Sequence, residues 1–122
     1  VLSRGLGDVY KRQPIINIMN EISVVELKKM FDQNENFVLL DVRENEELQI
    51  AQVKPHNHIP MGQIPERIDE LDKDDSYIVM CHSGMRSARV CQYLEGQGYN
   101  VKNLNGGIDS WSVNIDPTVP RY

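Results

Sequence analysis

The residues of this sequence that could do chemistry are concentrated in segment 81–87, which reads Cys-His-Ser-Gly-Met-Arg-Ser. Cys81 follows the apolar run at residues 77–80, which is typical of a buried strand, and helix-type spacing begins near Ser87. A cysteine at that junction would lie among loop amides and at the positive end of a helix dipole. Such surroundings favour the thiolate, which is the nucleophilic form of cysteine. The spacing therefore predicts that Cys81 is a nucleophile.

The rest of the same segment could bind whatever group the sulfur attacks or carries. Backbone N–H groups in a loop before a helix can surround an anion, and an arginine side chain adds a forked cationic donor. For two residues of this segment a structural role is the alternative: His82 could simply face solvent, and Arg86 could bond to a loop carbonyl. We predict that six residues bind substrate: His82, Ser83, Gly84, Met85, Arg86 and Ser87.

A second group of charged residues follows the apolar run at residues 37–40, in the order Asp41-Val42-Arg43-Glu44. Ligands of open parallel sheets bind beyond the carboxyl ends of the strands, so this segment is expected near Cys81. We predict that Asp41 and Arg43 brace the neighbouring loops as a buried ion pair rather than contact substrate. Removing one partner of such a pair would leave a buried charge uncompensated.

The second cysteine, Cys91, falls on the apolar side of the helix predicted over residues 87–97. It is expected in the core, with a resolving or redox role as the alternative. His56 and His58 alternate along an extended segment and so point in opposite directions. Without a cysteine or acidic cluster at ligand spacing near these histidines, we predict no metal site.

Strand-type and helix-type segments alternate along the chain with short connections, which indicates an α/β fold with a parallel sheet. Ser23 and Glu26 have the spacing of a capping box, which predicts the start of a helix there. A further helix is expected where Ile64, Ile68 and Leu71 share one face. The strands are expected at residues 37–40, 58–60, 77–80 and 101–104, and the other helices at 44–50, 87–97 and 108–111.

The chain of 122 residues has 13 basic and 18 acidic residues and a net charge of −5. This balance argues against a nucleic-acid partner or an anionic membrane surface, since both need clustered positive charge. No apolar run approaches the length of about 20 residues that spans a bilayer. Two cysteines are too few for a disulfide scaffold, which favours a reducing, cytoplasmic location. Residues 1–13 lack an apolar period, so they are interpreted as a non-native or disordered leader before a single domain at residues 14–122.

Three segments in this order and spacing resemble the rhodanese homology domain: residues 39–44, residues 81–87, and residues 104–108 with Trp111. The resemblance spans residues 17–111 and implies a rhodanese-like α/β fold, with a central, mostly parallel five-stranded sheet flanked by helices on both faces. It implies a sulfurtransferase in which Cys81 takes a sulfane sulfur from a donor, holds it as a covalent persulfide without a cofactor, and passes it to a thiophilic acceptor. Related phosphatases and arsenate reductases have a longer C-x5-R loop, whereas Cys81 and Arg86 form C-x4-R. This spacing favours sulfur transfer over phosphatase activity.

The same resemblance implies donors and partners. The donor would be a small molecule such as thiosulfate, attracted by Arg86, or a protein persulfide. Residues 115–122 are similar to the ends of rhodanese domains fused to adenylating enzymes, which implies a ubiquitin-like sulfur carrier or an adenylating enzyme as partner. Residues 51–60 depart from the family, because they lack its Gly-His-Ile-x-Gly-Ala stretch. A non-catalytic interaction or regulatory domain of the same type is the alternative function.

Overall fold

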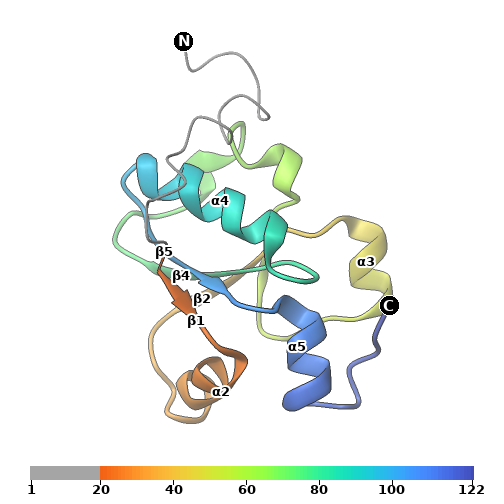
Figure 1. Cartoon of the computed structure of the whole chain (residues 1–122). Helices are drawn as coiled ribbons and strands as arrows, with labels where there is room; N and C mark the ends of the chain where they lie inside the picture. The colour runs from red at the N-terminus through yellow and green to blue at the C-terminus, as the bar shows by residue number, and fades with distance from the viewer. Residues whose placement is uncertain (1–19) are drawn as a thin grey trace.

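The computed structural model describes residues 20–122, so the leader predicted over residues 1–13 lies outside the described residues. The described residues form a five-stranded sheet in the order β1-β5-β4-β2-β3, with every neighbouring pair parallel (Figure 1). The parallel α/β fold expected from the sequence is therefore confirmed. The strands are β1 (Glu21–Ile22), β2 (Val38–Asp41), β3 (Asn57–His58), β4 (Ser76–Met80) and β5 (Asn100–Leu104).

The adjacent strands β2 and β4 end side by side. Asp41 pairs with Met80 in the register of these two strands, and the Val42 N–H donates to the Met80 carbonyl at 3.0 Å. This register carries the segments that follow both strands to the same edge of the sheet. The two groups of residues predicted from the sequence to do chemistry or to support it are therefore neighbours at the carboxyl ends of the strands.

Residues 20–122 contain four α-helices: α2 (Val24–Asp32), α3 (Asn45–Ile50) and α4 (Met85–Gly96), each between two strands, and α5 (Gly107–Asn114), which follows β5. The capping box predicted at the start of α2 is confirmed. Ser23 Oγ accepts from the Glu26 N–H, and the Glu26 carboxylate accepts from the Ser23 N–H. Helix α4 begins two residues earlier than predicted, and Gly84 provides the turn that precedes it.

The single helix predicted over residues 64–71 is wrong. Instead, the 3₁₀ turn η1 (Met61–Gln63) precedes that stretch, and a second one, η2 (Ile68–Glu70), lies within it. The Arg67 N–H donates to the Gln63 carbonyl at 3.0 Å, so one α-type turn spans Pro65. The bond that closes η2, from the Leu71 N–H to the Ile68 carbonyl, is instead of the i to i−3 kind. The apolar spacing still has the expected consequence for packing, because Ile64 is completely buried.

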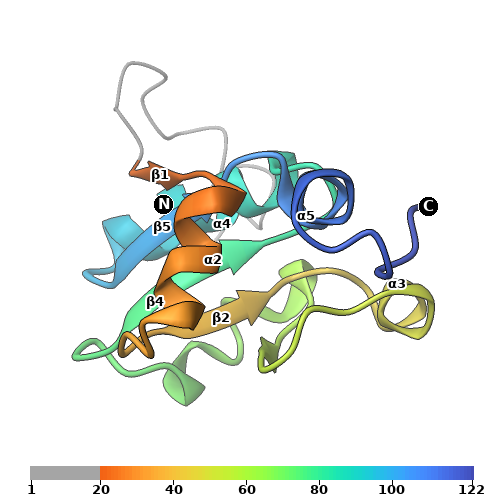
Figure 2. The ribbon, with the colours of Figure 1, turned by 90° about the horizontal axis from the view of Figure 1, so that it is seen from below.

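Each face of the sheet is covered by its own layer. Figure 1 shows α4 on one side of the sheet and α2 with α5 on the other, and Figure 2 gives the same molecule from below. On the α4 face, Val90, Cys91 and Leu94 pack with the two 3₁₀ segments in one apolar cluster. On the other face, Leu27 from α2 and Trp111 from α5 belong to a second cluster. The expectation of helices on both faces and of Cys91 in the core is confirmed.

The segment that departs from the family pattern still reaches the sheet. Ala51 and Val53 are buried, and β3 pairs with β2 through His58 and Asp41. The missing glycines therefore do not prevent residues 51–60 from adding the edge strand. None of the helices within residues 20–122 has the length and apolar character needed to cross a membrane.

Candidate active site

Residues 81–84 connect β4 to α4, and together with the first turn of α4 they surround the sulfur of Cys81. The side chain of Cys81 is buried at the end of β4, with 1% of the residue exposed. Gly84 has φ +103°, a left-handed conformation that side chains disfavour, and its N–H donates to Cys81 Sγ at 3.1 Å. A Cβ atom on Gly84 would lie 3.2 Å from the backbone nitrogen of Gly106. Glycine at this position is therefore what lets the loop turn back onto the sulfur.

The turn between β5 and α5 holds the other side of the loop. The Ile108 N–H donates to the Cys81 carbonyl at 2.9 Å, and the Asp109 N–H donates to the His82 carbonyl at 3.0 Å. A Cβ atom on Gly107 would overlap both of these carbonyl oxygens. Because the C=O and N–H of a trans peptide point in opposite directions, the N–H groups of the same two peptides point away from α5. The amino end of α5 thus fixes which way the loop amides face.

A buried polar network lies behind the sulfur. Ser87 Oγ is 3.3 Å from Cys81 Sγ and 2.5 Å from Asn103 Oδ1. Asn103 Nδ2 in turn donates to the Gly84 carbonyl at 3.1 Å, which fixes the orientation of the amide. A serine hydroxyl has one proton and two lone pairs, so it can serve only one of its two acceptors at a time. Ser87 can therefore donate to Asn103 while accepting from a thiol, or turn its proton toward a thiolate.

The predicted brace between the neighbouring loops is fully buried. Arg43 has no exposed surface and binds Asp41 through Nη2 at 2.7 Å and Nε at 3.0 Å. The same guanidinium donates to the Ala51 carbonyl at 2.8 Å, while the Arg43 carbonyl lies 2.6 Å from His58 Nε2. Burial opposes the charge on Arg43, but bonds to Asp41 and Tyr122 outweigh it and raise the arginine pKa. The pair links β2 to the residues on both sides of α3.

The side chain of Arg86 forms a salt bridge with the carboxylate of Glu47. Arg86 Nη1 and Nη2 donate to the two oxygens of Glu47 at 2.7 and 2.8 Å. The bonds from Arg86, the largest influence, lower the pKa of Glu47 to about 2, so the pair is ionised at neutral pH. The role of Arg86 as a ligand for an anionic donor stays a prediction. Glu47 matters for this role because it already binds both Nη atoms of Arg86.

The other predicted site residues divide by depth. Gly84 and Ser87 are buried and contact the sulfur, whereas the side chains of Ser83 and Met85 are exposed, Met85 to 70%. His82 is half-buried, and its ring stacks on that of Tyr122 with centroids 4.2 Å apart and planes 14° apart. The loop therefore has an inner side, which faces the sulfur, and an outer side, which faces solvent and the tail.

Three residues of the site were missed by sequence reasoning. Asn103 has a recognisable signal, since it lies two positions after Val101 in the strand and so shares the inward face with that apolar residue. Glu47 has a weaker one, because its carboxylate accepts from the Glu44 N–H three residues earlier, as at a helix start. Tyr122 has no local signal, since its hydroxyl bonds with Arg43 79 residues away and with Glu47 75 residues away.

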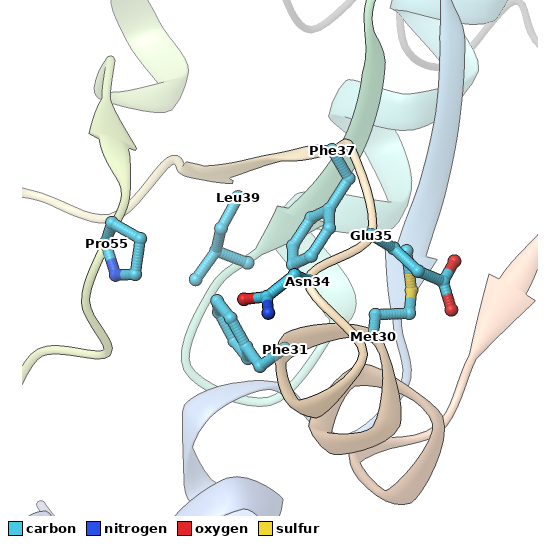
Figure 3. Close-up of a pocket in the computed structure, with 7 residues that line it drawn as sticks. All are labelled: Met30, Phe31, Asn34, Glu35, Phe37, Leu39 and Pro55. Atoms are coloured by element: carbon cyan, nitrogen blue, oxygen red, sulfur yellow. The ribbon is translucent and has the colours of Figure 1, made fainter.

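A surface cavity of about 280 Å³ lies elsewhere on the molecule (Figure 3). Its lining includes Phe31 of α2 and Phe37, which comes just before β2, together with Pro55. No residue of segment 81–87 lines it, and Phe37 is at the amino end of β2 whereas Cys81 is beyond the carboxyl end of β4. This cavity is therefore separate from the predicted site. Within residues 20–122, no group of three or more His, Cys, Asp or Glu side chains is arranged to hold a metal ion.

Comparisons with known proteins show which family and fold this chain shares. The sequence model of the rhodanese-like domain family matches residues 23–114. The chain is 42% identical over 99 residues to YtwF of Bacillus subtilis, a protein named provisionally as a sulfurtransferase. The aligned region includes 81% of this chain and 96% of that protein. It is 32% identical to the maize adenylyltransferase and sulfurtransferase MOCS3-1, matching 92% of this chain but 26% of the maize protein. A rhodanese-related protein of Thermoplasma volcanium has a similar solved structure, with a TM-score of 0.75, 30% identity, and coverage of 84% of this chain and 99% of the other.

Proposed function

Because this chain belongs to the rhodanese-like domain family, we propose that it is a sulfurtransferase that carries a sulfane sulfur as a persulfide on Cys81. The observation that carries the proposal is the pair of polar groups on the sulfur. The Gly84 N–H donates to it at 3.1 Å, and the Ser87 hydroxyl lies 3.3 Å away, where it can turn its proton toward a thiolate. A donor fixed in the backbone, such as the Gly84 N–H, stabilises negative charge on sulfur without having to reorganise during the reaction. The name of the Bacillus subtilis relative supports sulfur transfer as the general activity.

In the loading step, the Cys81 thiolate attacks the outer sulfur of the donor. With thiosulfate, a new S–S bond forms at Cys81, the S–S bond of thiosulfate breaks, and sulfite leaves with the electron pair of the broken bond. With a persulfide donor, R–S–SH, the same bond forms and the thiolate R–S⁻ leaves. In both cases one sulfur atom is transferred and the thiolate becomes a persulfide, so no external oxidant or reductant is needed.

In the unloading step, a thiophilic acceptor attacks the terminal sulfur of the persulfide. The S–S bond breaks, its electron pair returns to Cys81, and the thiolate is regenerated for another cycle. Covalent storage of the sulfur divides one difficult transfer into two easier displacements. Cyanide can serve as the acceptor in an assay, because it removes the terminal sulfur as thiocyanate.

The partner of this transfer is proposed from the maize relative. That protein is named as both an adenylyltransferase and a sulfurtransferase, and this chain matches about a quarter of it, 26%. We propose that the persulfide on Cys81 is delivered to a sulfur carrier that an adenylating enzyme has activated. An activated carrier carboxyl group is an electrophile, so the terminal persulfide sulfur would attack its carbonyl carbon, displace AMP and leave the carrier joined to Cys81 as an acyl disulfide. An external thiol would then attack the Cys81 sulfur of that S–S bond and release the carrier as a thiocarboxylate. A second thiol would reduce the resulting mixed disulfide and restore the Cys81 thiolate.

Intact-protein mass spectrometry tests the central claim. The wild type is expected to gain the mass of one sulfur atom after treatment with thiosulfate or with the persulfide of a cysteine desulfurase, and to lose it with cyanide. Cys81→Ser should abolish this gain, because a hydroxyl cannot form the persulfide. Cys91→Ala is the matched control and should keep the gain, since Cys91 is buried and its burial raises the thiol pKa.

The outcome that contradicts the proposal is equally clear. A wild-type protein that gains no sulfur from either donor is not a persulfide carrier. The alternative, a non-catalytic interaction or regulatory domain, would then be favoured, and its partner binding should survive Cys81→Ser. A Cys81→Ser variant that still loads sulfur would instead move the nucleophile elsewhere in the chain.

A further inference from the structure

The carboxylate of Glu47 is the centre of a cluster that closes over the outer side of the active-site loop. It accepts two bonds from Arg86, at 2.7 and 2.8 Å, and one from the hydroxyl of Tyr122, at 2.6 Å. A fourth donor, the Glu44 N–H, lies 3.0 Å away. A carboxylate has about four lone-pair positions, so this one is fully engaged. Glu47 is thus a built binding partner for Arg86.

Tyr122, at the end of the chain, bonds with Glu47 and so helps to fix the Glu47–Arg86 pair. Its hydroxyl accepts from Arg43 Nη1 at 3.0 Å while donating to Glu47, and its ring stacks on His82. Residues 116–122, which we call the tail segment, are further anchored by Arg121, whose Nε donates to Asp109 of α5 at 2.9 Å. Both views place the end of this segment beside α3 (Figures 1 and 2). The tail segment therefore fixes Glu47 where it meets Arg86.

The Glu47 cluster reduces the attraction between the active-site loop and an anionic sulfur donor. Thiosulfate carries two negative charges and must approach a thiolate on a chain whose net charge is −5. A free guanidinium at the loop would offset that repulsion, but Arg86 is paired with Glu47 and Arg43 with Asp41. A persulfide carried by a larger thiol brings at most one negative charge on its sulfur atoms. It therefore depends much less on a free cation at the loop.

We infer that Glu47 is a positioning residue that sets the choice of sulfur donor. By neutralising Arg86 it makes the site a poor binder of small dianionic donors and leaves a protein-bound persulfide as the preferred donor class. This inference rests on the proposed function, because it concerns the loading of Cys81. It also revises the role predicted for Arg86, which becomes available to thiosulfate only when Glu47 is neutral.

The test compares two donors on purified variants of the whole chain. The rate of sulfur loading on Cys81 is followed by mass spectrometry, with thiosulfate in one series and the persulfide of a cysteine desulfurase in the other. Glu47→Gln keeps the shape of the side chain but removes its charge. We expect it to raise the second-order rate of loading from thiosulfate by about tenfold, the effect of one charge-assisted contact. Loading from the desulfurase should change little.

Three further variants separate the release of Arg86 from other effects. Glu46→Gln removes the same charge from an exposed neighbour on α3 and should leave both rates unchanged. Glu47→Gln combined with Arg86→Ala should return thiosulfate loading to the wild-type rate, since the freed cation is gone. Tyr122→Phe removes the hydroxyl but keeps the ring on His82. It should raise the thiosulfate rate less than Glu47→Gln does.

The outcomes distinguish the two proposals. Loading from thiosulfate that is unchanged in Glu47→Gln, while Cys81 still loads, overturns the inference and leaves the proposed function standing. An equal gain in Glu46→Gln also overturns it, because the effect would then come from net charge alone. Equal gains with both donors would mean that Glu47 slows loading from any donor, and would likewise overturn the inference that it sets the choice of donor. No loading of Cys81 in any variant overturns the proposed function itself.

Discussion

The inner and outer sides of the active-site loop are built in different ways. The inner side consists of buried groups around Cys81, namely the Gly84 amide and the Ser87 hydroxyl, with Asn103 behind them. The outer side consists of charged and aromatic side chains that are partly exposed, with Arg86 on Glu47 and His82 on Tyr122.

The difference concerns what each side can control. The inner side touches the sulfur, so it determines whether a thiolate and then a persulfide are stable there. The outer side touches Cys81 only through the loop, and its carboxylate and guanidinium determine which charges can approach. Under the proposed function, the capacity to carry sulfur and the choice of donor would therefore belong to separable sets of residues.

The largest loss of stability should come from a substitution at Gly107, which packs against the backbone of Cys81 and His82. Gly107→Ala would place a Cβ atom on the Cys81 and His82 carbonyl oxygens, at a backbone φ of +60° that alanine disfavours. Overpacking and the left-handed conformation together should cost about 2–5 kcal/mol of unfolding free energy. Urea unfolding measures the loss, and persulfide loading should fall with it.

Gly62→Ala is the control for that substitution. No atom lies within 4 Å of the position where a Cβ on Gly62 would be, and its φ is not left-handed. Its unfolding free energy should therefore stay within about 0.5 kcal/mol of wild type. If Gly107→Ala unfolds at the same urea concentration as Gly62→Ala, the amino end of α5 does not hold the loop as described.

Asn103→Ala should have an intermediate effect that sharpens the comparison. It removes the acceptor of Ser87 and the donor to the Gly84 carbonyl, both of which are buried. Leaving such groups unsatisfied costs about 1–3 kcal/mol. Because Ser87 and Gly84 both contact the sulfur, loading of Cys81 should slow equally with thiosulfate and with a desulfurase persulfide.

The matched control is another asparagine of the same strand. Asn100 is exposed and bonds with Ser76 Oγ at 2.9 Å. Asn100→Ala should change the unfolding free energy by less than about 1 kcal/mol and leave the loading rate unchanged. A donor-dependent change in Asn103→Ala would count against the separation of the two sides, since only the outer side should discriminate between donors.

The same division shows how far the sequence could predict this molecule. The buried strands, the capping box at Ser23 and the loop at Cys81 are local patterns, and the fold and the position of the loop followed from them. The helix predicted over residues 64–71 is wrong because apolar spacing identifies buried residues such as Ile64 but does not distinguish an α-helix from a series of short turns. The start of α4 was missed by two residues because the conformation of Gly84 is set by tertiary contacts.

The outer side lay beyond sequence reasoning for a physical reason. Arg86 and Glu47 are 39 residues apart, and each belongs to a segment whose own pattern is complete without the other. Periodicity identifies which residues are buried, but it does not identify which exposed charges meet across the surface. The sequence therefore predicts a substrate anion or a loop carbonyl as the partner of Arg86, and its pairing with Glu47 is seen only in the three-dimensional arrangement.

The smallest effect concerns the acid stability of the outer side. Glu47 has a pKa of about 2, below its ordinary value of 4.5, chiefly because Arg86 binds the charged form. A lowered folded-state pKa adds stability that is fully present above the unfolded pKa and is lost as the pH falls through the folded one. The stability that Glu47 adds over Glu47→Gln should be constant at neutral pH, about 1 kcal/mol for this partly exposed pair, and shrink between pH 4.5 and 2. Urea unfolding of both proteins across that range measures it, and a difference that persists undiminished at pH 2 would mean that the Glu47 charge does not stabilise the fold.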